Sequence, residues 1–138
     1  MIKRDITLGE LRNRLFERGL SLGVSTRFDL LDILRSKTGA ENDAVFFEVY
    51  REFDGFEEAD QRSYIKLWST EEVLREHTSD YGKKRPDFIA IGDFLIGSDF
   101  IMYNMQQDKL YMLHDSFYAG DNLYDFLVKL TNGDFDRF

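Results

Sequence analysis

The chain has 138 residues, of which 43 % are hydrophobic, 15 % aromatic and 32 % charged, and its formal net charge is −8. This length and composition suffice for one hydrophobic core and exclude a disordered polymer, so we expect a folded domain. The absence of cysteine excludes a disulfide framework, a thiolate zinc site and a thiol nucleophile, and the acidic charge opposes binding to nucleic-acid backbones.

Three amphipathic helices are predicted in the first part of the chain. Thr7, with Glu10 three residues later, forms a capping box, and leucines then repeat on one helical face. A second helix is expected over residues 26–38, and a third, capped by Asp43, runs to the turn at Asp54-Gly55.

Strands and two further helices are predicted after residue 60. Short runs rich in aromatic and β-branched residues indicate strands at residues 63–68, 87–91, 99–105 and 109–114. Ser69 and Glu72 form a second capping box, which predicts a short helix after the first strand. Residues 106–108 form a tight connection, so the last two strands should pair as a hairpin. A final helix begins at Asp121 or Asn122 and ends at Asn132-Gly133.

The order of these elements predicts an α+β fold. We expect a mainly antiparallel sheet of about four to six strands, packed with N-terminal and C-terminal helices, in one domain over residues 1–138. The first residues lack the apolar core of a signal peptide, and no apolar run approaches the roughly 18 residues of a membrane span. We therefore expect a cytoplasmic protein without a membrane partner.

Gly92 and Gly97 have the spacing of the glycines in a phosphate-binding loop. Such a loop also needs a lysine and a following helix, so that a cation and backbone N–H groups face the phosphates. Ser98 stands where the lysine belongs, and the run after it is strand-like. We expect these glycines to turn one strand into the next, with no nucleotide site.

Metal and catalytic sites have little support. His77 and His114 lie on separate elements, and neither belongs to a spaced ligand motif. Asp93, Asp99 and Asp108 could meet near the ends of adjoining strands and bind a hard cation through oxygen ligands. Acidic loop ends are common in a chain this acidic, so we expect no metal, no cofactor and no catalytic residue.

Most of the acidic excess comes from one segment. The segment from Glu41 to Asp60 contains one basic residue, Arg51, and eight acidic residues. The acidic residues are Glu41, Asp43, Glu48, Glu52, Asp54, Glu57, Glu58 and Asp60. They form either a solvated helix face and loop, or an acidic patch that steers a basic partner. Trp68, the single tryptophan, is either a core residue or an interface anchor.

Three stretches and the closing helix resemble the SUKH superfamily, in its Smi/Knr-type branch. The stretches are VYREFDGF (49–56), YIKLWSTEEV (64–73) and PDFIAIGDFLIGSDFIMYN (86–104). The resemblance covers residues 26–131 and leaves residues 1–23 as an N-terminal helical extension, either packed on the core or free as an arm. It marks as structural turn residues of the family motif Gly55, Trp68, Gly92, Asp93, Gly97 and Asp99. This chain departs from the family pattern at Asp54-Gly55, where asparagine-glycine is usual, and at Ile96-Gly97, where a double glycine is frequent.

This resemblance implies an α+β domain that binds proteins and has no catalytic machinery. In bacteria such domains are immunity proteins that neutralise a cognate toxin, often a nuclease, and in fungi a related domain lies in a regulator of cell-wall synthesis. Nuclease toxins are often basic because they approach phosphates, so an acidic inhibitor can occupy the same surface.

We therefore expect a bacterial immunity protein whose partner is a basic toxin domain. The acidic residues expected to contact this partner are Asp54, Glu57, Glu58 and Asp60, whose negative electrostatic field would attract it. The aromatic residues expected to anchor the interface are Tyr64 and Tyr118. Two alternatives remain open. One is a regulatory or scaffolding domain that binds a housekeeping protein, and the other is a binder of a small ligand or metal at the Asp93–Asp99 turn.

Overall fold

The computed structural model of the protein describes residues 6–23, 27–38, 44–77, 88–94, 99–104, 107–112 and 122–136. Within these parts, five helices lie at Leu8–Glu17 (α1), Phe28–Thr38 (α2), Val45–Glu52 (α3), Thr70–His77 (α4) and Leu123–Thr131 (α6). Four strands lie at Ile65–Leu67 (β1), Phe88–Phe94 (β2), Asp99–Asn104 (β3) and Lys109–Met112 (β4). The predicted α+β class is confirmed, and each described element lies within a few residues of its predicted position.

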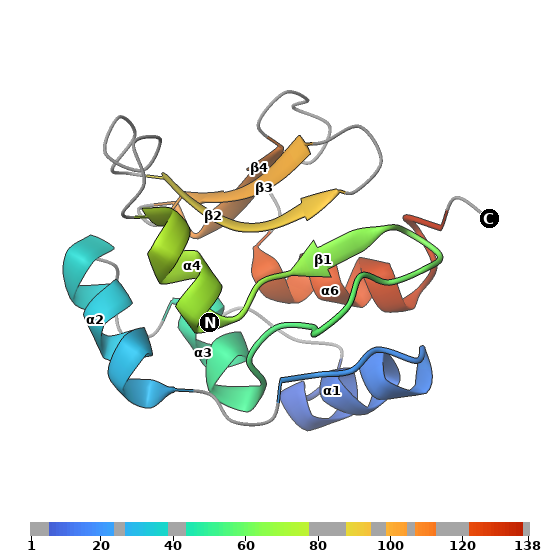
Figure 1. Cartoon of the computed structure of the whole chain (residues 1–138). Helices are drawn as coiled ribbons and strands as arrows, with labels where there is room; N and C mark the ends of the chain where they lie inside the picture. The colour runs from blue at the N-terminus through green and yellow to red at the C-terminus, as the bar shows by residue number, and fades with distance from the viewer. Residues whose placement is uncertain are drawn as a thin grey trace.

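The four strands form one antiparallel sheet in the order β1-β2-β3-β4 (Figure 1). The predicted hairpin is confirmed, because β3 pairs with β4 and the register brings Asn104 opposite Lys109. The register between β2 and β3 shifts between Ala90 and Gly92. Gly92 lies inside β2 at this irregularity, so the expectation that it turns one strand into the next is wrong. The next described element is a strand and not the helix of a phosphate-binding loop, as predicted. Gly97, the second glycine of the phosphate-loop pattern, lies outside the described residues.

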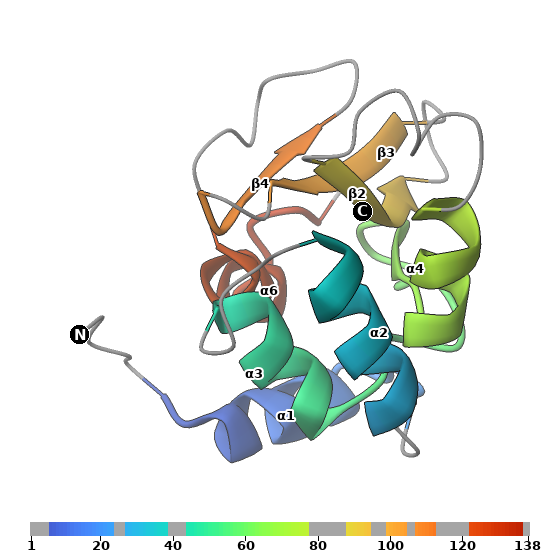
Figure 2. The ribbon, with the colours of Figure 1, turned by 90° about the vertical axis from the view of Figure 1, so that its left-hand side faces the viewer.

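The helices gather on one face of the sheet (Figures 1 and 2). Phe46 of α3 stacks on Tyr103 of β3 with ring centroids 4.7 Å apart, and on Tyr50 at 4.6 Å. The α4 helix packs against β2, and α6 packs against β4. The buried apolar side chains of these helices and strands form one hydrophobic cluster, so the sheet and the helical layer share a core.

The N-terminal segment is part of this core. Leu11 and Leu15 of α1 are fully buried, and α1 packs against α3 and α6. After α1, the Gly23 N–H donates to the Gly55 carbonyl at 3.0 Å, and the Asp54 N–H donates to the Gly23 carbonyl at 2.8 Å. Residues 6–23 are therefore no free arm, and the core extends beyond the region that resembles the family.

Three helices begin at the caps that the sequence predicts. The side chains of Thr7 and Asn122 accept from the N–H groups at the third positions of α1 and α6, at 3.1 and 2.8 Å. Ser69 and Glu72 cap α4 reciprocally: the Ser69 N–H donates to Glu72 Oε1 at 3.2 Å, and the Glu72 N–H donates to Ser69 Oγ at 3.3 Å. Both partners of each bond lie three residues apart, so the local sequence suffices to predict them.

The α3 helix begins without a cap from its own segment. Its predicted cap, Asp43, lies outside the described residues, and the observed cap residue, Ala44, makes no side-chain cap hydrogen bond. Instead, the Val45 N–H donates to Oδ2 of Asp108, in the β3–β4 turn, at 3.0 Å. The other oxygen of Asp108 accepts from the Tyr103 hydroxyl at 2.7 Å. Burial, and next this hydrogen bond, raise the pKa of Tyr103, so the hydroxyl keeps its proton at neutral pH.

We expect Asp108→Ala to lower the free energy of unfolding by about 1–2 kcal/mol, because α3 loses its only observed cap and Tyr103 loses its acceptor. Asp108→Asn is the matched control. Asparagine keeps an acceptor oxygen and tolerates the left-handed conformation at this position, where φ is 55°, so its loss should be smaller. Urea unfolding of both variants checks this, and equal losses would contradict the capping role.

Candidate protein-binding surface

Two motif glycines lie where the chain passes very close to β1. Gly55 has a φ of +74°, and a β-carbon there would lie 2.5 Å from the carbonyl oxygen of Trp68. At Gly92 a β-carbon would lie 2.3 Å from the carbonyl oxygen of Lys66. Real side chains do not tolerate such distances, so only glycine lets these backbone segments meet. We call Gly55, Trp68, Gly92 and Asp93 the glycine junction.

Trp68 is the side chain that closes this junction. It is 7 % exposed, and its indole N–H donates to Asp93 Oδ2 at 2.8 Å. The Tyr50 hydroxyl donates to the Trp68 carbonyl at 2.6 Å, and Phe100 meets the indole edge-on. Trp68 thus lies in the core and is no exposed anchor. Of the remaining motif residues, Gly97 lies outside the described residues, and Asp99 is described only as the first residue of β3.

Gly55→Ala should destabilise the protein by about 2 kcal/mol or more, because the new methyl group meets backbone atoms and φ is positive. Gly19→Ala separates these two effects. Gly19 also has a positive φ, +96°, but nothing lies within 4 Å of its added β-carbon, so it should cost only about 1 kcal/mol. Chemical unfolding measures both losses, and an equal loss would show that contact with β1 is unimportant.

The four carboxylates that we expected to contact a partner differ in their surroundings. Asp54 accepts from both the N–H and the hydroxyl of Thr70, at 2.7 and 2.6 Å, and so supports the start of α4. Asp60 is only 3 % exposed. The expectation that Asp60 faces a partner is therefore wrong, because its carboxylate is buried and paired inside the fold. Asp54 is half-buried, and its Oδ1 serves the start of α4. Glu57 and Glu58 are exposed.

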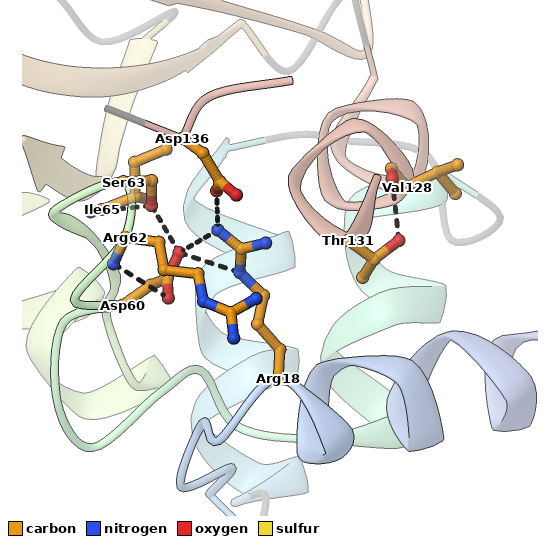
Figure 3. A network of polar contacts seen from close by, with 8 residues as sticks. All are labelled: Arg18, Asp60, Arg62, Ser63, Ile65, Val128, Thr131 and Asp136. Carbon is orange, nitrogen blue, oxygen red and sulfur yellow. Dashed lines mark hydrogen bonds and ion pairs between the residues drawn. The ribbon is translucent and has the colours of Figure 1, made fainter. Parts of the chain in front are cut away.

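Asp60 is held by an arginine from the N-terminal segment (Figure 3). Arg18 donates to Asp60 Oδ2 through Nε at 2.9 Å and through Nη2 at 2.7 Å. Nη2 also bonds to Asp136, and the Ser63 hydroxyl donates to Asp60 Oδ2 at 2.7 Å. We call Arg18, Asp60 and Asp136 the Arg18 clasp. It joins the end of α1, the segment before β1 and the C-terminal segment after α6.

The protonation states of the clasp follow from its contacts. Burial opposes ionisation of Asp60, but the hydrogen bonds from Arg18 and Ser63 and the charge of Arg18 outweigh it, so the pKa of Asp60 is lowered. For Arg18, burial is likewise outweighed by the hydrogen bonds and charges of Asp60 and Asp136, and its pKa is raised. Arg18 and Asp60 are therefore both charged at neutral pH.

The clasp fixes the loop of residues 57–64. The Tyr64 N–H donates to the Asp60 carbonyl at 2.6 Å, and Tyr64 has a φ of 59°, which non-glycine residues rarely adopt. The Asp60 N–H donates to the Ile65 carbonyl at 2.9 Å. Glu57, Glu58, Gln61 and Arg62 are exposed on this loop, while Tyr64 is half-buried. Tyr118, the other predicted anchor, lies outside the described residues.

A pocket of about 330 Å³ lies between residues 18–21 and residues 58–62. Arg18 and Asp60 lie at its inner side, because their side chains are 5 % and 3 % exposed. Sequence reasoning did not identify Arg18 as a site residue. Its partners Asp60 and Asp136 lie 42 and 118 residues away along the chain, so no local pattern could have revealed them.

Asp60→Asn should lower the free energy of unfolding at pH 7 by about 2–3 kcal/mol, because Arg18 loses a buried partner and keeps only Asp136. Since folding lowers the pKa of Asp60, its charge stabilises the fold above the ordinary aspartate pKa of about 3.9, and this contribution is lost as the pH falls. The stability gap between wild type and variant should therefore narrow from pH 7 to pH 3.

Glu52→Gln is the control for this experiment. Glu52 lies 3.8 Å from Arg12, and the two side chains are 34 % and 53 % exposed, so its loss should stay below about 1 kcal/mol. Urea unfolding at both pH values measures the gaps. If the difference in free energy of unfolding between wild type and Asp60→Asn is as large at pH 3 as at pH 7, the stabilisation does not come from an ionised Asp60.

Neither the models of protein families nor the curated proteins contain a match to this chain. In the described parts of the chain, no group of three histidine, aspartate or glutamate residues could hold a metal ion. Two of the aspartates considered for this role bond within the fold, Asp108 to the start of α3 and Asp93 to Trp68. None of the described helices combines the length and the apolar character needed to cross a bilayer.

Proposed function

We propose that the protein is a non-enzymatic protein-binding domain, and most concretely a SUKH-like bacterial immunity protein that acts in the cytoplasm on a basic toxin domain. The observation that carries the proposal is the pair Glu57 and Glu58. Both are exposed, and within the described parts of the chain neither carboxylate has a hydrogen-bond or ion-pair partner.

The loop that carries these two glutamates suits recognition because it is already ordered. The Arg18 clasp and the backbone bonds of Asp60 hold residues 57–64 in one conformation. A fixed loop loses less conformational entropy on binding than a mobile one. Two adjacent carboxylates, on a chain with a net charge of −8, attract a basic surface and speed its approach.

Affinity purification of the tagged protein from its native cells at low salt, followed by a salt wash and mass spectrometry, identifies the partner. Recovery of one basic toxin domain that salt releases supports the immunity role. Recovery of a housekeeping protein would instead support a regulatory or scaffolding role. Recovery of no protein would contradict both the immunity role and the regulatory or scaffolding role.

With the partner in hand, the double variant Glu57→Lys, Glu58→Lys should reduce the association rate constant at low salt by about tenfold or more. The double variant Glu71→Lys, Glu76→Lys makes the same change in net charge at exposed positions of α4, and it should have a smaller effect. Surface plasmon resonance at two ionic strengths measures both. The difference in association rate constant between the two variants should be smaller at physiological salt, where the screening length is about 8 Å. Equal effects of the two variants would show that loop 57–64 does not attract the partner specifically.

A further inference from the structure

The segment that follows α1 runs back beside the chain that leads into β1 (Figure 1). Two backbone hydrogen bonds join the two segments, from the Glu57 N–H to the Ser21 carbonyl at 2.7 Å and from the Gly23 N–H to the Gly55 carbonyl at 3.0 Å. These bonds enclose an antiparallel bridge between Leu22 and Phe56. We call residues 21–23 the outer strand, because they lie on the side of segment 55–57 that is turned away from β1.

The two bonds around this bridge fix the direction of the backbone groups of Leu22. In an antiparallel pair, bonds that flank two opposite residues leave the N–H and C=O groups of those residues pointing away from each other. The Phe56 N–H accordingly donates to the Leu67 carbonyl of β1 at 2.8 Å. The Leu22 N–H and carbonyl point the other way, and among the residues that the structure describes neither group has a hydrogen-bond partner.

A donor and an acceptor that leave one residue in the same direction favour a peptide backbone as their ligand. One residue of an added antiparallel strand completes both hydrogen bonds, because it presents its own N–H and C=O side by side. A carboxylate supplies acceptors alone and an ammonium group supplies donors alone, so each would leave one group of Leu22 unpaired. Proteins bind extended segments of their partners at sheet edges in this way.

The side chains of the outer strand decide what such a segment carries. Opposite residues of an antiparallel pair project to the same face, so Ser21 shares a face with Glu57, and Leu22 shares the core face with Phe56. Ser21 and Glu57 are exposed, whereas Leu22 packs against the core. An added strand would lie two strand spacings, about 10 Å, from Glu57. A lysine or arginine can reach the Glu57 carboxylate from there, because the small side chain of Ser21 leaves the path open.

We propose that the outer strand binds an extended segment of the partner as an added antiparallel strand, with a lysine or arginine opposite Ser21 that pairs with Glu57. This inference rests on the proposed function, because it names the conformation and the charge of the partner segment. The backbone groups of Leu22 hold the segment, and the carboxylate of Glu57 selects its basic side chain.

Amide hydrogen exchange of the free protein tests the edge before any ligand is added. After correction for intrinsic rates, the Leu22 N–H should exchange about tenfold faster or more than the neighbouring Gly23 N–H, which is bonded to Gly55. Equal protection of the two amides would show that the Leu22 N–H is already paired, and this would overturn the inference.

A blocked pentapeptide, acetyl-Thr-Lys-Thr-Lys-Thr-amide, tests binding without the partner. Its central threonine would lie opposite Leu22, and its lysines would lie on the face of Ser21. Titration into the full chain, labelled with nitrogen-15, should shift the amides of Ser21, Leu22 and Gly23 saturably and slow the exchange of the Leu22 N–H. A peptide this short should have a dissociation constant of about 1 mM or weaker. Absence of both effects would mean that no strand is added at this edge.

Modified peptides separate the backbone bonds from the charge. N-methylation of the central threonine removes the N–H that would bond to the Leu22 carbonyl and should abolish binding. N-methylation of the fourth residue, whose N–H would point away from the outer strand, should leave binding intact. Replacement of both lysines by glutamate should weaken binding about two- to fivefold or more. Equal binding of the two methylated peptides, or of the lysine and glutamate peptides, would overturn the inference.

Two variants of the protein test the role of Glu57. Glu57→Gln should abolish the preference for the lysine peptide over the glutamate peptide. Asp32→Asn makes the same change in net charge at an exposed position on α2 and should keep that preference. An undiminished preference in Glu57→Gln would show that this carboxylate does not select the basic residue. None of these results depends on the partner, whereas failure of the proposed function is shown by the purification and by the charge-reversal variants.

Discussion

The contact on which the candidate site depends is the buried pair between Arg18 and Asp60. The guanidinium is planar and has five donors, so it can bond to Asp60 through two nitrogens and to Asp136 as well. A lysine ammonium has no such planar geometry and could not hold both carboxylates in the same way. Three distant parts of the chain meet at this group, and it fixes both loop 57–64 and one wall of the pocket.

Two other long-range contacts hold the first turns of α3 and α4. Asp108, in the β3–β4 turn, accepts from the first N–H of α3, so the hairpin supplies a cap that the helix lacks in its own segment. Asp54, which follows α3, accepts from the first N–H of α4 in addition to the capping box of Ser69 and Glu72. At the glycine junction, Gly55 and Gly92 let backbone segments approach to distances that exclude a β-carbon. Removing any of these contacts disturbs helix and sheet together.

The fold decides which described carboxylates of the acidic segment are accessible. Net charge describes attraction at a distance, but binding requires side chains that are accessible. Asp54 and Asp60 are used internally, whereas Glu57 and Glu58 are exposed beside the pocket.

The sequence by itself determined the elements whose signals are local. The caps at Thr7, Ser69 and Asn122 and the β3–β4 hairpin join residues a few positions apart, so they could be predicted. Only the tertiary structure decided the roles of Asp54, Asp60 and Asp108, whose partners lie 16, 42 and 63 residues away. An aspartate has the same local sequence signal whether it caps a distant helix, pairs with a buried arginine or faces solvent. The fold places its partner, and this placement decides which carboxylates remain available for binding.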